Sequence, residues 1–212
     1  NDNKVNGSSY GILNSGAIGT IENNGQITAN ELAIYINNYN NIENNTTGKI
    51  VNNGEIDGRY IGIYIFSSNN QNPAIELVNN GMLTGGEYAF FIDNYNSNTT
   101  DVTLNNTGLI KGDIYSGSTK PLTINGGTTT QGTLTGLNGV GNINNYGSGV
   151  VFGTGSLLLN DHIYTADTVL NREAALQVNN SITISGNYHQ NAAATLISGI
   201  ADLETLGNDV TA

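Results

Sequence analysis

Apolar and polar residues alternate along short stretches of this chain, and the pattern recurs. The clearest copy covers residues 50–65, where apolar side chains alternate on both sides of an Asn-Asn-Gly turn at 52–54 and continue as Ile61, Ile63 and Ile65. A two-residue period is typical of half-buried β-strands, whereas a helix places apolar residues at i, i+3, i+4 and i+7. The pattern therefore predicts an all-β protein with several short strands in each repeat.

The repeat has a nearly constant length. The first Asn of each turn falls at Asn23, Asn52, Asn79 and Asn105, in steps of 29, 27 and 26 residues. Self-similarity at such a period indicates a solenoid, a propeller or an array, and a propeller blade needs four antiparallel strands in roughly 40–50 residues. We therefore predict a parallel β-helix, or β-solenoid, with three strands per coil. Each strand then pairs with its equivalents in the coils above and below.

The chain divides into two regions that differ in strand length and in the length of the turns. Residues 1–149 carry the repeats, and loops are expected to project after the third strands at 37–40, 66–69 and 93–96. Because the coils stack in register, these loops should form a column along one edge of the rod. In residues 150–212 the strands become longer and more apolar and the turns shorter. We interpret this second region as the closing coils and cap, since the terminal repeats of a solenoid differ from the others.

Charge and composition exclude several kinds of function. The net charge of −11, with only six Lys and Arg, would repel a phosphate backbone, so nucleic acid is not an expected partner. The absence of Cys excludes a disulfide framework and thiolate metal sites. Neither His162 nor His189 has a second His at ligand spacing. We expect no metal, no cofactor and no enzymatic activity.

The last third of the chain resembles the C-terminal passenger segment of autotransporters. Three elements follow in the order of that family: a Gly-x-Tyr-x-Gln strand, a Leu-containing strand and a Leu-x-x-x-Gly element. In this chain they comprise Gly186, Tyr188 and Gln190, then Leu196, then Leu203 and Gly207. The Asn-Asn-Gly-x-Ile-x-Gly repeats upstream are similar to the passenger repeats of the same family.

This resemblance implies a right-handed parallel β-helix whose last coils act as an autochaperone-like folding segment. It also implies a location on the bacterial cell surface, where a C-terminal outer-membrane β-barrel that is not part of these 212 residues would export and anchor the passenger. The expected partners are a second copy of the protein, or a host or matrix protein or glycan.

Aromatic and amide side chains in the expected loops are the candidate binding residues. Tyr39, Phe66 and Tyr95 fall at nearly the same place in successive loops, with Asn38 and Asn94 next to the two tyrosines. Aromatic side chains flanked by amides offer a large contact area at a small cost in conformational entropy. The alternative interpretation is that these rings pack down on their own loops.

Two other groups lie in strands. Tyr35 and Tyr64 are expected to mark the core or the wall of the solenoid rather than a ligand site. Glu55, Asp57 and Arg59 alternate around an inward Ile and are expected on one acidic outer face. Some polysaccharide-processing enzymes with a β-helix use acidic clusters on such a face, but a solvated strand face with a weak surface ion pair is the simpler interpretation.

Three functions are compatible with these patterns. The first is an adhesin passenger that mediates cell–cell aggregation, biofilm formation or attachment to host or matrix, because weak contacts repeated along a rigid rod add up by multivalency. The second is a passive stalk that presents a catalytic domain upstream. The third, ranked below the other two, is an enzyme that acts on polysaccharides.

Overall fold

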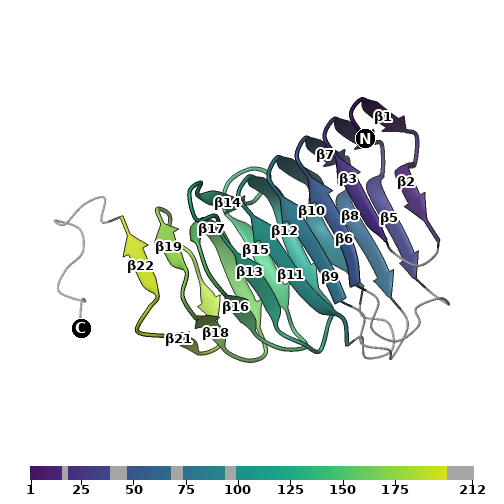
Figure 1. Cartoon of the computed structure of the whole chain (residues 1–212). Coiled ribbons are helices and arrows are strands. Elements are labelled where there is room, and N and C mark those ends of the chain that lie inside the picture. The colour runs from purple at the N-terminus through teal and green to yellow at the C-terminus, as the bar shows by residue number, and fades with distance from the viewer. Residues whose placement is uncertain (16–18, 39–46, 68–73, 94–98, 200–212) are drawn as a thin grey trace.

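The strands stack into one elongated rod. The structure, a computed structural model, describes residues 1–15, 19–38, 47–67, 74–93 and 99–199. The chain advances from one end of the rod to the other, from purple to yellow in Figure 1, and every pairing between named strands is parallel. The predicted parallel β-solenoid is confirmed. Within these residues, no helix has the length and hydrophobicity needed to cross a membrane.

Each coil contributes to three faces of the rod. The first face contains β1 (Lys4–Gly7), β4 (Gln26–Ala29), β7 (Glu55–Gly58), β10 (Met82–Ile92), β12 (Leu109–Ser116), β14 (Gly132–Thr135), β17 (Ser156–Thr165), β19 (Ala175–Val178) and β22 (Thr195–Ser198). The second face contains β2 (Tyr10–Asn14), β5 (Leu32–Asn38), β8 (Ile61–Ser67), the C-terminal halves of β10, β12 and β17, and also β15 (Gly141–Asn145) and β20 (Ile184–Ser185). The third face contains β3 (Thr20–Asn23), β6 (Thr47–Asn52), β9 (Ala74–Asn79), β11 (Asp101–Asn106), β13 (Leu122–Asn125), β16 (Val150–Phe152), β18 (Val169–Asn171) and β21 (Tyr188–Gln190).

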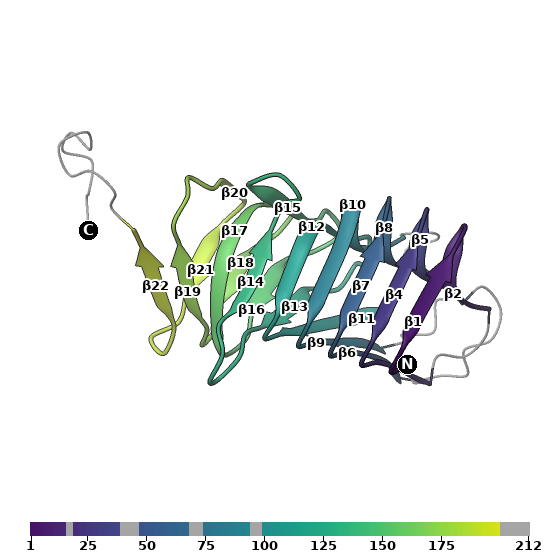
Figure 2. The ribbon, with the colours of Figure 1, turned by 90° about the horizontal axis from the view of Figure 1, so that it is seen from above.

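The first two faces belong to one 14-stranded sheet, because β10, β12 and β17 run through the corner between them without a break. Figure 2 shows these long strands beside the separate short strands of the N-terminal coils. The bend in β12 falls at Gly112, whose φ of 124° lies in the region that L-residues with a side chain avoid. A Cβ there would also approach the carbonyl oxygen of Gly85 in the neighbouring coil to 2.5 Å. Glycine is therefore required at this corner.

Aliphatic side chains fill the interior in columns along the rod. Residues one coil apart in sequence lie one above the other and are fully buried. The column behind the first face comprises Ile27, Ile56, Leu83, Ile110, Leu134 and Leu159. Burying each such side chain contributes about 1.5–3 kcal/mol to stability. These are inward positions of the alternating pattern, so the sequence correctly predicted which side of these strands faces the core. Ile61 is an exception, because the pattern grouped it with Ile63 and Ile65 but it is only half-buried.

Buried asparagines form a ladder at the corner between the third and first faces. Asn23, Asn52, Asn79 and Asn106 are fully buried, and each amide nitrogen donates to the amide oxygen of the next at 2.9, 2.8 and 2.8 Å. The same nitrogens donate to backbone carbonyls of the following coil, as Asn52 does to Met82 at 2.9 Å. These bonds satisfy polar groups that would otherwise be costly to bury.

The ladder corrects one detail of the predicted repeat. The register pairs Asn79 with Asn106, so the step there is 27 residues and the equivalent residue is Asn106 rather than Asn105. Asn105 points to the other side of β11 and donates to Glu76 at 2.8 Å. A shift of one residue in a strand moves a side chain to the opposite face, and sequence spacing alone does not fix the register to that accuracy.

The solenoid continues through the predicted boundary between residues 149 and 150. Val150 in β16 pairs with Leu122 in β13, and the same sheet extends through β18 to β21. The two strands on which the autotransporter resemblance depends are present as β21 and β22, while Leu203 and Gly207 lie outside the described residues. Residues 150–199 are therefore further coils of the same rod.

Candidate binding surface

The loop residues chosen from the sequence are only partly described. Tyr39, Asn94 and Tyr95 lie outside the described residues, and Asn38 ends β5 with a side chain that is not described. Phe66 belongs to β8, where it pairs with Asn37, so it lies in a strand and not in a loop. The predicted column of loop aromatics therefore remains a prediction, and Phe66 is corrected to a strand position.

Glu55 and Asp57 lie on the same outer face of β7, as predicted, on either side of the buried Ile56. Glu55 accepts a hydrogen bond from the Gln26 side chain at 2.6 Å. Burial raises the pKa of Asp57, and the nearby Glu55 carboxylate raises it further. Two neighbouring carboxylates raise each other's pKa because both charges are hard to hold close together.

Arg59 does not join this pair, contrary to the prediction. Strand β7 ends at Gly58, and the corner that follows places the Arg59 guanidinium 5.6 Å from the centroid of the Tyr60 ring. The alternation of sides holds only within a strand, so it could not be extended across the corner. The arrangement leaves two carboxylates on β7 without the arginine that the sequence pattern had grouped with them.

A column of half-buried aromatic rings runs along the outside of the second face. Centroid distances are 5.4 Å for Tyr10–Tyr35, 5.1 Å for Tyr35–Tyr64, 5.2 Å for Tyr64–Phe91 and 4.7 Å for Phe91–Tyr115. Such ring pairs each contribute about 0.5–1.5 kcal/mol beyond the area they bury. We call this surface the aromatic face; it comprises Tyr10, Leu13, Leu32, Tyr35, Ile61, Tyr64, Phe66, Tyr88, Phe91 and Tyr115.

The register explains why these side chains meet. Tyr35 pairs with Tyr64, Tyr64 with Phe91 and Phe91 with Tyr115, so successive strands about 4.8 Å apart place one ring on the next. Tyr35 and Tyr64 were expected to mark the core or the wall of the solenoid, and that expectation missed this surface. The signal was available, because an aromatic residue recurs in the third strand of four consecutive repeats, directly after the inward residue.

Acidic side chains lie close to the rings. The Tyr64 hydroxyl donates to the Asp93 carboxylate at 3.0 Å, and burial together with this bond raises the pKa of Tyr64. Burial also raises the pKa of Tyr35, Tyr88 and Tyr115, and the charges of Asp93 or Asp113 add to the effect. A negative charge next to a phenol disfavours the phenolate, so these four tyrosines keep their hydroxyl protons to higher pH than an isolated tyrosine.

The aromatic face ends where β15 begins. Tyr115 pairs with Asn144, which in turn pairs with Tyr164, and Asp113 accepts two hydrogen bonds from Asn142, at 3.0 Å from its backbone and 2.7 Å from its side chain. The side chains that point outward from β15 on this part of the second face are amides. The outer side of the rod is thus aromatic over the N-terminal coils and mainly polar beyond them.

One buried carboxylate lies beneath this transition. Asp161 is 1% exposed, it points inward from β17, and its Oδ2 atom has no hydrogen-bond partner. Burial raises the pKa of Asp161 to about 7, the Asp113 charge adds to this, and a hydrogen bond from the Gly141 backbone opposes it. Asp161 is therefore part of the interior and not of an exposed site.

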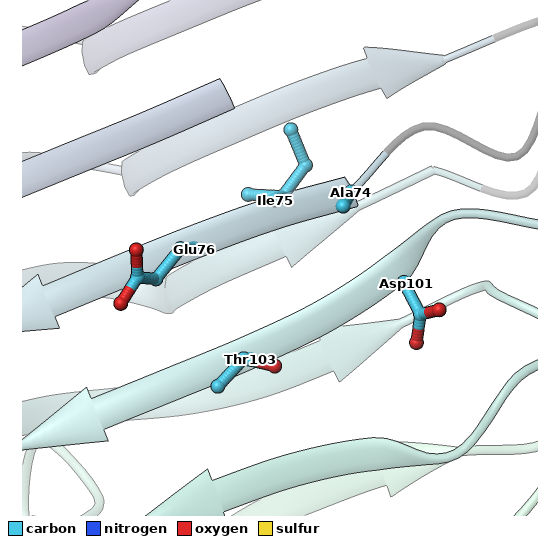
Figure 3. Close-up of a pocket in the computed structure, with 5 residues that line it drawn as sticks. All are labelled: Ala74, Ile75, Glu76, Asp101 and Thr103. Atoms are coloured by element: carbon cyan, nitrogen blue, oxygen red, sulfur yellow. The ribbon is translucent and has the colours of Figure 1, made fainter. Parts of the chain in front are cut away.

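A shallow depression on the third face carries two further carboxylates, Glu76 and Asp101 (Figure 3). Both already have cationic partners, because Lys49 lies 3.0 Å from Glu76 and Lys120 lies 3.2 Å from Asp101. Exposed ion pairs of this kind contribute about 0–1 kcal/mol and leave no unpaired charge for a ligand. The depression is therefore a charge-paired strand surface.

Among the described residues, no group of three or more His, Asp or Glu side chains is placed to hold a metal ion. The aromatic face is a continuous surface of one chemical character, which suits binding by contact area. Comparisons with protein-family models, with curated proteins and with solved structures found no match.

Proposed function

We propose that this chain is a segment of a surface-exposed bacterial adhesin whose rod binds its partners through the aromatic face. The observation that carries the proposal is the aromatic column itself, in which Tyr10, Tyr35, Tyr64, Phe91 and Tyr115 follow one another over five consecutive strands. Patches of exposed apolar side chains on the surface of a soluble protein commonly mark interaction sites, and tyrosine is enriched at interfaces.

A rigid repetitive rod suits this role. The parallel strands hold the rings at a fixed spacing, so little conformational entropy is lost when a partner covers several of them. Individually weak contacts along the rod then add up, as in other multivalent binders. The autotransporter resemblance supports display on the cell surface, and the adhesin would act there in aggregation, biofilm formation or attachment to host or matrix.

Bacteria or beads that display the protein provide the test. The double variant Tyr35→Thr and Tyr64→Thr introduces β-branched residues, which favour strands, at both positions but removes the centre of the aromatic column. We expect it to abolish most aggregation and surface attachment. The matched control is Leu158→Thr with Tyr164→Thr, which removes two half-buried outward side chains from the C-terminal coils. This control should attach normally.

A third variant separates the aromatic face from the loops. Replacement of Tyr39 and Tyr95 by Ser changes the two tyrosines that the sequence placed in projecting loops and leaves the aromatic face intact. Attachment should persist in this variant. If it is lost here and kept in the Tyr35 and Tyr64 variant, the binding surface lies in the loops and the assignment to the aromatic face is wrong. Circular dichroism of each variant confirms that the strands are retained.

A passive stalk is the second candidate. The uninterrupted stacking from β3 to β21 on the third face favours it, because a stalk needs only length and rigidity. In that case the aromatic variants and their control would attach equally well.

A further inference from the structure

The charges that border the aromatic face are mainly negative. Glu31 and Glu87 are exposed at the corner beside it, and Asp93 and Asp113 lie at its other margins, close enough to raise the pKa of its tyrosines. The six Lys and Arg of the chain all lie in described segments. None of them is on β2, β5, β8 or the C-terminal half of β10 or β12; they are Lys4, Lys49, Arg59, Lys111, Lys120 and Arg172.

Arg59 lies at the same corner as Glu31 and Glu87, but its guanidinium is already engaged. Arg59 packs over the ring of Tyr60, which lies between the chain segments of Glu31 and Glu87. Lys111 is in β12 but pairs with Thr84 and Thr135, which places it on the first face. The aromatic face therefore presents apolar edges and tyrosine hydroxyls within an acidic rim, and a partner must supply the positive charge.

The packing of the rings also restricts the partner. Tyr35 and Tyr64 stack with an interplanar angle of 22°, and Phe91 and Tyr115 stack at 15°. The rings of each stacked pair cover one another's faces, and Tyr64 meets Phe91 edge to face at 78°. Ring faces that are turned toward a neighbouring ring are closed to a ligand. Sugars and nucleic-acid bases bind aromatic side chains by lying flat on an open ring face. A protein surface with both apolar and hydrogen-bonding groups matches ring edges better than a flat sugar or base does.

We propose that the aromatic face binds a protein segment that carries Lys or Arg side chains among apolar residues. The apolar side chains would cover the rings while the cations pair with Glu31 and Glu87 at the rim. This inference rests on the proposed adhesive function and specifies the chemistry of its partner. A second copy of this chain fits less well, because each copy has a net charge of −11 and the aromatic face has no cation to offer.

The test uses the complete 212-residue chain and a fluorescently labelled synthetic peptide of alternating Leu and Arg. A second peptide carries Glu in place of Arg, and a cello-oligosaccharide represents glycans. We expect the Arg peptide to bind, with an affinity that falls as salt is added, and the other two probes not to bind. Anisotropy measures the peptides and calorimetry measures the oligosaccharide. Binding of the oligosaccharide, or of the Glu peptide as tightly as the Arg peptide, would overturn the proposal.

Two charge-matched variants locate the binding site. Glu31→Gln with Glu87→Gln neutralises the rim, and Glu22→Gln with Glu173→Gln removes the same net charge from exposed positions outside the aromatic face. Two lost rim pairs should weaken binding of the Arg peptide roughly fivefold, since each exposed pair is worth up to about 1 kcal/mol. The control pair should change it by less than about twofold, because screening weakens distant charges. Equal effects would show that net charge, and not the rim, attracts the peptide.

The same variants separate this inference from the proposed function. If displayed cells lose attachment with Tyr35→Thr and Tyr64→Thr but keep it with Glu31→Gln and Glu87→Gln, adhesion through the aromatic face stands and the cationic partner is wrong. Concentration-dependent dimerisation of the wild-type chain that disappears in the tyrosine variant would likewise replace the cationic partner with a second copy. Sedimentation velocity measures that outcome directly.

Discussion

The N-terminal coils and the C-terminal coils of this rod share one interior but differ at their corners and surfaces. From β3 to β12 the corner holds the ladder of buried asparagines and the second face carries the aromatic column. From β13 onward the aliphatic columns continue through Leu134, Leu159 and Ile163, yet in the described residues of these coils neither the ladder nor the column continues. A solenoid interior thus tolerates changes that its polar and aromatic columns do not.

The spacing of the coils explains why the ladder stops. Residues that pair on the third face are 29, 27 and 27 positions apart for Asn23, Asn52, Asn79 and Asn106, whereas Asn105 pairs with Asn125 after only 20. The register then places Gly126 where the ladder would need its next asparagine. A shorter coil changes the corner geometry, while the inward and outward alternation within each strand is unaffected. Ladders therefore depend on coil length, and the core depends only on alternation.

The largest expected effect comes from breaking the ladder. Asn79 accepts a hydrogen bond from Asn52 and donates to Asn106, to the Leu109 carbonyl and to the Gly81 carbonyl, all from a fully buried position. Asn79→Ala removes these bonds and leaves buried polar groups without partners. We expect the free energy of unfolding to fall by about 4 kcal/mol, as measured by urea denaturation.

Asn53→Ala is the matched control for that substitution. Asn53 belongs to a second, exposed row of amides in which it donates to Asn24 at 2.7 Å and accepts from Asn80 at 2.7 Å. Water can replace these bonds, so the loss should stay below about 1 kcal/mol. Similar losses in the two variants would contradict the view that burial gives the inner ladder its importance.

Much of the fold could be predicted from the sequence, because alternation in single strands decides which residues face the core. Ile56 and Ile63 were predicted to face inward on that basis, and Leu83 fits the same pattern. All three are fully buried. The aromatic face could not be predicted with equal certainty, because it depends on pairing between strands about 27 residues apart. Asn105 was misplaced by one residue for the same reason, and Arg59 because a corner interrupts the alternation.

The second-largest expected effect comes from the buried carboxylate of the C-terminal coils. The pKa of Asp161 is raised to about 7 from an ordinary value of 3.8, so the native state holds its proton more tightly than the unfolded state does. Its contribution to stability is therefore complete below about pH 4 and is lost as the pH rises towards 7. In Asp161→Asn this loss cannot occur. Between pH 4 and pH 8 the variant should gain about 3 kcal/mol relative to wild type.

Urea denaturation of both proteins at several pH values measures this difference. Other carboxyl groups are common to both proteins, so contributions that do not depend on Asp161 cancel in the comparison. The control is Asp57→Asn, where the pKa is also raised but the side chain is only half-buried on the first face. Its pH profile should differ from wild type by much less. Parallel profiles for wild type and Asp161→Asn would show that Asp161 is ionised in the folded protein.

The smallest expected effect compares two tyrosine hydroxyl groups on either side of the transition between the two regions. The Tyr64 hydroxyl donates to the Asp93 carboxylate at 3.0 Å from within the aromatic column, and Tyr64→Phe removes only that group. We expect a loss of about 1 kcal/mol in thermal or urea denaturation, because a hydrogen bond to a charged acceptor is stronger than a neutral one but this site is partly exposed.

Tyr146→Phe provides the contrast. Its ring is 60% exposed and its hydroxyl donates to the neutral amide of Asn144 at 3.2 Å, a bond that water can replace. The loss should therefore be under about 0.5 kcal/mol. If Tyr64→Phe were as neutral as Tyr146→Phe, the Asp93 carboxylate would not be bound to the column. The position of Asp93 at the margin of the aromatic face would then not depend on this hydrogen bond.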